Sequence, residues 1–128
     1  MAVTVAIVDD NPLNVESLAL LVRNMGISTV VFDTPDALIE SLDTLDHLDV
    51  VFLDLEFPNQ NGLKAIQWMK RAQPLQDVPF VAYTVHTSEQ NEARDAGFHS
   101  FLGKPLNVVK FPEQMRRILN GEHVWEIG

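Results

Sequence analysis

The stretch VTVAIVDDNPLNVESLALLVRNMG, residues 3–26, joins two hydrophobic periods at a pair of aspartates. Its first six residues form an apolar run rich in β-branched side chains, which predicts a buried strand. Beyond Pro12, apolar residues recur at intervals of three and four up to Gly26, which is typical of a helix that ends at a glycine. Asn11 followed by Pro12 is enough to start that helix. The adjacent charges of Asp9 and Asp10 therefore need another explanation.

The same alternation of strand and helix patterns repeats along the chain. Four more short apolar runs follow, starting at Ser28, Asp49, Pro79 and Ser100. Most of the runs are almost continuously hydrophobic, as in strands covered on both faces of a parallel sheet. Five such alternations predict a doubly wound α/β fold with right-handed connections. The last helix is expected to start late, near Phe111, or to bend, because Pro112 cannot donate a helical hydrogen bond.

The charge and length of the chain narrow its function. At 128 residues the chain fits one domain, and its net charge of −9 with nine scattered Lys and Arg argues against direct binding of nucleic acid. It lacks cysteine, so disulfides and thiolate metal sites are excluded. No apolar run approaches the ~20 residues of a membrane span, and the first residues do not resemble a secretory signal. We therefore expect a cytoplasmic protein whose partners are proteins or metal ions, with no membrane association.

Polar residues follow the predicted strands at their carboxyl ends, where ligands bind in folds of this kind. These residues are Asp9, Asp10, Asp54, Thr84 and Lys104. Two unit charges ~4 Å apart repel by ~4 kcal/mol at an effective dielectric of ~20, so three carboxylates need a cation. Lys104 offers one positive charge, and a hard divalent ion such as Mg²⁺ would offer two. The set looks built to receive a phosphoryl group.

Four motifs carry a family resemblance. The motifs VDD, FLDLEFPNQNG, YT and FLGKP occur in this order, each at a predicted strand end. Together they resemble the receiver domain of bacterial two-component response regulators, of the stand-alone type, over Val3 to about Leu119. The resemblance implies a flavodoxin-like (βα)5 fold with a five-stranded parallel sheet in the order 2-1-3-4-5. It places the receiver domain at residues 1–121 and a C-terminal tail at residues 122–128.

The resemblance also implies a role for each site residue. Asp54 would accept the phosphoryl group, and Lys104 would pair with the phosphoryl oxygens. Asp10, Asp54 and the backbone carbonyl of Glu56 would ligate Mg²⁺, or Mn²⁺ in its place, while Asp9 would act mainly through a bound water. The domain would catalyse its own phosphorylation and dephosphorylation without being a turnover enzyme.

Other positions would switch the domain. Thr84 would hydrogen-bond the phosphoryl group, and Phe101 would then move, altering the surface made by the fourth helix, fifth strand and fifth helix. The bond between Lys104 and Pro105 is expected to be cis. Gly62 matches the glycine that ends the loop after the phosphoacceptor.

Three residues are expected to tune the reaction. Val85 follows Thr84, where the family usually has a smaller residue, so Val85 should narrow access and slow phosphorylation by small donors. Glu56 and His86 flank the path of the hydrolytic water in this family and should tune the lifetime of the acyl phosphate.

The expected partners are a histidine kinase or histidine phosphotransfer protein and a downstream protein target, with a phosphorylation-dependent homodimer as an option. A receiver-like interaction module that acts without phosphorylation is the alternative. A flavin binder would need a Ser/Thr/Gly phosphate loop after its first strand, where this chain has DDNPLN.

Overall fold

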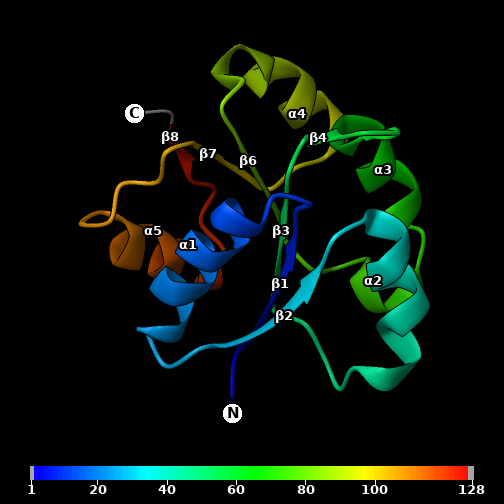
Figure 1. The fold of residues 1–128 in the computed structure, drawn as a ribbon, viewed down its shortest axis with the longest axis horizontal. Coiled ribbons are helices and arrows are strands. Elements are labelled where there is room, and N and C mark those ends of the chain that lie inside the picture. The colour runs from blue at the N-terminus through cyan, green and yellow to red at the C-terminus, as the bar shows by residue number, and fades with distance from the viewer. Residues whose placement is uncertain (1, 127–128) are drawn as a thin grey trace.

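A parallel sheet of six strands in the order β2-β1-β3-β6-β7-β8 forms the centre of the computed structural model, which describes residues 2–126 (Figure 1). The strands of this sheet are β1 Thr4–Val8, β2 Ser28–Phe32, β3 Val50–Leu53, β6 Phe80–Thr84, β7 Ser100–Gly103 and β8 Trp125–Glu126. The first five confirm the predicted order 2-1-3-4-5. The sixth strand, β8, differs from the predicted five-stranded sheet, and it lies within the segment 122–128 that is predicted to be a tail.

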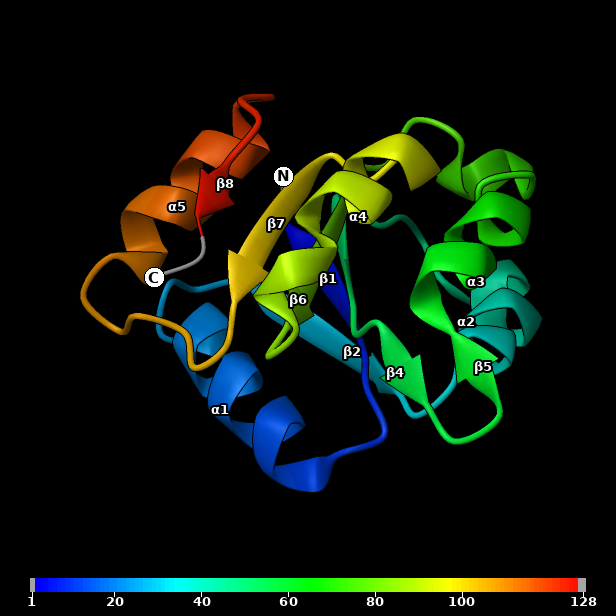
Figure 2. The same cartoon turned by 90° about the horizontal axis from the view of Figure 1, so that it is seen from above.

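Five helices cover the two faces of the sheet. They are α1 Pro12–Arg23, α2 Pro35–Ser41, α3 Gly62–Met69, α4 Gln90–Ala96 and α5 Phe111–Leu119. Short 3₁₀ turns lie at Leu42–Thr44, Gln73–Leu75 and Thr87–Glu89, and a small antiparallel hairpin pairs β4 Glu56–Phe57 with β5 Gln60–Asn61. Helices α1 and α5 lie on one side of the sheet, and α2, α3 and α4 on the other (Figure 2).

Local chemistry fixes where the helices begin. The Asn11 side chain accepts hydrogen bonds from the backbone N–H groups of Leu13 and Asn14, so this residue caps α1 as predicted. Thr34 caps α2 in the same way. Helix α5 begins at Phe111, which confirms the late start that Pro112 imposes. The aspartates before α1 are therefore not needed to cap it.

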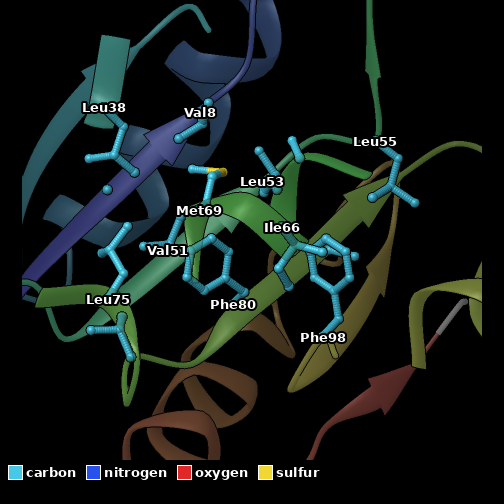
Figure 3. Close-up of a cluster of buried hydrophobic side chains, with 14 of the residues drawn as sticks. Val8, Leu38, Val51, Leu53, Leu55, Ile66, Met69, Leu75, Phe80 and Phe98 are labelled. Atoms are coloured by element: carbon cyan, nitrogen blue, oxygen red, sulfur yellow. The ribbon is translucent and has the colours of Figure 1, made fainter. Parts of the chain in front are cut away.

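The sheet separates two hydrophobic cores. In β3, Val51 and Leu53 pack toward α2, α3 and α4, in a cluster that also contains Phe80 and Phe98 (Figure 3). Phe101 belongs to the same cluster. The alternate residue Phe52 packs toward α1 and α5. All four residues of β3 are fully buried, which accounts for the continuous apolar run in its sequence.

The parallel register brings the functional strand ends together at one edge of the sheet. Val8 is level with Leu53, and Leu53 is level with Ala82, so β1, β3 and β6 end side by side. No helix within residues 2–126 is long and apolar enough to cross a membrane.

Candidate phosphoacceptor and metal site

Three carboxylates meet at the carboxyl ends of β1 and β3. Asp9, Asp10 and Asp54 each place one carboxylate oxygen within 4.8 Å of the others. Asp9 and Asp54 are buried, whereas Asp10 is exposed. The convergence predicted from the strand ends is confirmed, and the three residues differ in how far solvent reaches them.

Asp9 is held on both of its carboxylate oxygens. Its Oδ1 accepts a hydrogen bond from the backbone N–H of Asn11 at 2.9 Å. Its Oδ2 accepts one from the Tyr83 hydroxyl at 2.7 Å and lies 3.2 Å from Nζ of Lys104. Burial, followed by the charge of Asp9, raises the pKa of Tyr83 far above its usual range, so the phenol stays protonated and donates. These contacts fix Asp9 as a rigid support at the floor of the site.

Asp54 lies in an environment that disfavours its charge. Burial raises the pKa of the Asp54 carboxyl to about 6; Lys104 opposes this shift and Asp9 adds to it. Oδ1 of Asp54 accepts a hydrogen bond from the backbone N–H of Leu55 at 2.8 Å and lies 3.5 Å from Nζ of Lys104. One ammonium group thus serves two buried carboxylates, and a further cation would lower the electrostatic cost of both.

Lys104 reaches the carboxylates from the loop after β7. Its side chain is about one-tenth exposed, and its Nζ lies 4.3 Å from the centre of the Tyr83 ring. The peptide bond to Pro105 is cis, as the resemblance implied. The backbone N–H of Lys104 donates to the carbonyl of Thr84 at 2.9 Å, which joins the end of β7 to the end of β6.

A cleft of about 550 Å³ opens above Asp54. Most of the residues predicted for the site line it: Asp10, Asp54, Glu56, Thr84, Val85, His86 and Lys104. Phe101 does not, because it is fully buried in the core on the α4 side of the sheet. Of the two predicted switch residues, Thr84 therefore lines the cleft with the residues predicted to react, whereas Phe101 lies in the core.

Two of the predicted tuning residues are in direct side-chain contact beside the cleft. Nε2 of His86 lies 2.6 Å from Oε1 of Glu56, so the loops after β3 and β6 are linked. Val85 is 63% exposed and lines the same cleft. The backbone N–H of His86 donates to Oγ1 of Thr84 at 3.0 Å.

Gly62 lies at the start of α3, directly against the backbone of Asp54 and Leu55. Its N–H donates to the carbonyl of Leu55 at 2.9 Å. A Cβ atom at this position would collide with the carbonyl oxygen of Asp54 and the Cα of Leu55. Only glycine leaves the backbone of Asp54 where it is.

The carboxylates fit a hard divalent cation. Three carboxylate oxygens within 4.8 Å of one another form a donor set of the type that binds Mg²⁺, which prefers a few carboxylates completed by water and phosphoryl oxygens. Asp10 is the most open of the three, since both oxygens of Asp9 already accept hydrogen bonds and Asp54 is buried.

Tyr83 is the site residue that sequence reasoning missed. The YT motif drew attention to Thr84, but the phenol that precedes it reaches Asp9, 74 positions earlier in the chain. A buried tyrosine needs a hydrogen-bond partner for its hydroxyl, and this was the available signal. Identifying Asp9 as the partner requires the strand order.

The chain is thus a doubly wound α/β domain with an acidic cleft at its strand ends, in which one lysine lies between two buried aspartates. The family model described as the response regulator receiver domain matches residues 5–116, and the chain belongs to this family. It is a receiver domain of two-component signal transduction.

Relatives and solved structures agree with this assignment. The polar-differentiation response regulator DivK of Brucella ovis is 30% identical over 123 residues, which cover 93% of this chain and 98% of DivK. A putative response regulator from Chloroflexus aurantiacus superposes with a TM-score of 0.84 at 20% identity, covering 94% of this chain and 99% of that one. The receiver domain of the sensor histidine kinase PA1611 from Pseudomonas aeruginosa, described with a magnesium ion coordinated in its active site cleft, gives 0.80 at 19% identity, with the same two coverages.

Proposed function

We propose that this receiver accepts a phosphoryl group on Asp54 from a histidine kinase or histidine phosphotransfer protein, in a Mg²⁺-dependent reaction. One observation carries the proposal: the buried Asp54 carboxylate faces an open cleft with Lys104 at 3.5 Å and two further carboxylates beside it. A structural ion pair would not need the additional negative charges or the cleft.

The residues of the chain position the reacting groups. A carboxylate oxygen of Asp54 bonds to phosphorus as the bond from phosphorus to the donor's imidazole nitrogen breaks, and the imidazole leaves. Such transfers depend on positioning and on stabilising charge that develops on the phosphoryl oxygens. Lys104 supplies a positive charge that Asp9 and Tyr83 hold in place. Oγ1 of Thr84 already accepts from His86, so its own proton is available for a phosphoryl oxygen.

The acidic residues would hold the metal ion. Asp10, Asp54 and the carbonyl of Glu56 would ligate Mg²⁺, or Mn²⁺ in its place, with Asp9 acting through a water because its oxygens are engaged. A bound ion supplies positive charge against the incoming phosphoryl group. The magnesium described for PA1611 supports this assignment by analogy.

Phosphorylation would be read out as a change of surface. Movement of Thr84 toward the phosphoryl group would free space for Phe101 and alter the face formed by α4, β7 and α5, where a downstream protein or a second phosphorylated copy would bind. The domain would work in the cytoplasm and would not turn over a separate substrate.

The test is phosphorylation by phosphoramidate with Mg²⁺, followed by gel electrophoresis that retards acyl phosphates. The parent chain should be retarded, and Asp54→Asn should not. Asp95→Asn is the matched control, because Asp95 is an exposed aspartate on α4 outside the cleft. Equal retardation of the Asp54→Asn variant would disprove the assignment, and no retardation of the parent by any phosphodonor would favour the interaction module.

A further inference from the structure

Strand β8 lies on the face that the proposed switch would alter. Strand β8 extends the sheet beyond β7 in parallel, with Trp125 level with Phe101 and Glu126 level with Leu102. The backbone N–H of Phe101 donates to the carbonyl of Val124 at 2.8 Å. In Figure 2, β8 lies beside β7 and along α5. The edge of β7 is thus already paired with a short strand from the same molecule.

The segment leading into β8 is firmly attached. Val124 is fully buried in the core on the α1 and α5 side, and its N–H donates to Oγ of Ser100 at 3.0 Å. Nδ1 of His123 lies 2.8 Å from the carbonyl oxygen of His99. These contacts anchor the chain up to Val124. The two residues of β8, Trp125 and Glu126, are called the tip below.

The tip is held by side chains from three elements. The Trp125 ring packs on Phe101 of β7 with 5.6 Å between ring centres, and the guanidinium of Arg94 of α4 lies 4.5 Å from the Trp125 ring centre. Glu126 accepts hydrogen bonds from two residues of α5, Gln114 at 2.6 Å and Arg117 at 3.3 Å. The side chains of Phe101, Arg94, Gln114 and Arg117 thus hold an aromatic residue followed directly by a carboxylate, and the surface that they form is called the groove below.

The tip does not satisfy the groove completely. Trp125 and Glu126 are only half-buried. The indole N–H of Trp125 is buried without a hydrogen-bond partner among residues 2–126. An extended segment that offers a carbonyl to this N–H would therefore compete well for the groove.

The tip also lies directly on the proposed switch residue. Phe101 is fully buried, with Ala82 of β6 level with it on one side and Trp125 on the other. Thr84 lies two residues further along β6 and is level with Gly103 of β7. A change in the position of Phe101 cannot leave the Trp125 ring where it is, because the two rings are in contact.

We propose that the groove over β7 between α4 and α5 is a strand-addition docking site, with Trp125 and Glu126 as its displaceable internal occupant. The partner is a protein that inserts an extended segment in which an aromatic residue is followed by Asp or Glu. Phosphorylation loosens the tip through Phe101; this coupling rests on the proposed function, whereas the docking site does not.

The docking site is tested with a fluorescein-labelled peptide of residues 122–128, EHVWEIG, by fluorescence anisotropy. It is titrated with the full-length chain and with a full-length variant carrying Trp125→Ala and Glu126→Ala. In this cleared variant, the two side chains of the tip no longer occupy the groove. A tethered occupant competes at an effective concentration near the millimolar range, so the cleared variant should bind the peptide about tenfold more tightly or better. A peptide with Ala and Lys in place of Trp and Glu is the control and should not bind.

Further variants guard against misfolding and self-association. If the double variant loses its native circular dichroism, Glu126→Lys replaces it, because this side chain is partly exposed. Adding Arg94→Ala and Arg117→Ala should abolish peptide binding. Equal affinity for parent and cleared chain, no binding to either, or equal binding of the control peptide would overturn the proposal. So would a parent dimer held by exchanged tips, because the occupant would then be a second copy.

The coupling is tested separately with fluorotryptophan-labelled chain by ¹⁹F NMR, on adding beryllofluoride and Mg²⁺. The Trp125 resonance, assigned with Trp125→Phe, should shift or broaden. Amide shifts around Asp54, recorded in a separate ¹H–¹⁵N spectrum, without any change in the ¹⁹F resonance of Trp125 would overturn the coupling. If no resonance changed at all, the proposed function would fail, and the peptide titration would still decide the docking site.

Discussion

Replacing Tyr83 by phenylalanine removes one oxygen atom from the floor of the site. The hydroxyl donates to Oδ2 of the buried Asp9 at 2.7 Å, and hydrogen bonds to charged groups contribute ~1.5–3 kcal/mol. The edge-to-face contact between Tyr83 and Phe52, with ring centres 5.9 Å apart, should survive because the ring is unchanged. We expect the free energy of unfolding in metal-free buffer at pH 7.5 to fall by about 2 kcal/mol. Urea denaturation measures it, and the denaturant slope should stay constant.

A double-mutant cycle with Asp9→Ala shows whether the loss belongs to this contact. Without the carboxylate, the Tyr83 hydroxyl is a buried donor with no acceptor, so Tyr83→Phe should then be neutral or stabilising. A loss below ~0.5 kcal/mol in the parent, or an equal loss in the Asp9→Ala background, would refute the role assigned to Tyr83.

Four further predictions concern the cleft. The pKa of Asp54 is raised to about 6 by burial, so its stabilising contribution is complete below the unfolded pKa and is lost as the pH rises through about 6. Asp54→Asn should therefore be more stable than the metal-free parent by up to roughly 3 kcal/mol at pH 7.5 in urea denaturation, and by almost nothing at pH 4. Gly62→Ala should cost about 1–3 kcal/mol in thermal unfolding and slow phosphorylation, because the added Cβ displaces the backbone of Asp54; unchanged values would contradict the contact. Removing either Glu56 or His86 breaks the same 2.6 Å side-chain contact, so both single alanine variants and the double variant should show one common acyl-phosphate lifetime, different from the parent's. Val85→Ala should speed phosphorylation by acetyl phosphate severalfold by widening the cleft, and an unchanged rate would show that Val85 does not limit access.

The sequence predicts five of the six strands of the sheet and most of the cleft residues, for a definite physical reason. In a parallel sheet all strands end at the same edge, so Asp9, Asp54 and Thr84 had to meet once their strands were recognised. The late start of α5 followed from the missing N–H of Pro112, and the cap of α1 from Asn11.

The contacts that the sequence could not reveal join residues from segments that come together only in the folded chain. Tyr83 reaches Asp9 across β3, and no local pattern encodes that span. The described part of strand β8 is Trp125–Glu126, which is too short to show a hydrophobic period in the sequence. Only the contacts of Trp125 with Phe101 and Arg94 reveal where it packs. The contact between Glu56 and His86 depends on two segments that meet only in the folded chain.

The alternation of side chains along β6 and β7 has a consequence for how such a domain can diversify. Tyr83 and Leu102 point into the core beneath α1 and α5, together with the support for Asp9, while Ala82 and Phe101 point into the core beneath α4. Substitutions on the α4 side can therefore accumulate without disturbing the contact between Tyr83 and Asp9. Recognition of new partners could evolve, or be engineered, on one side of the sheet while Asp9 keeps its support from Tyr83 on the other.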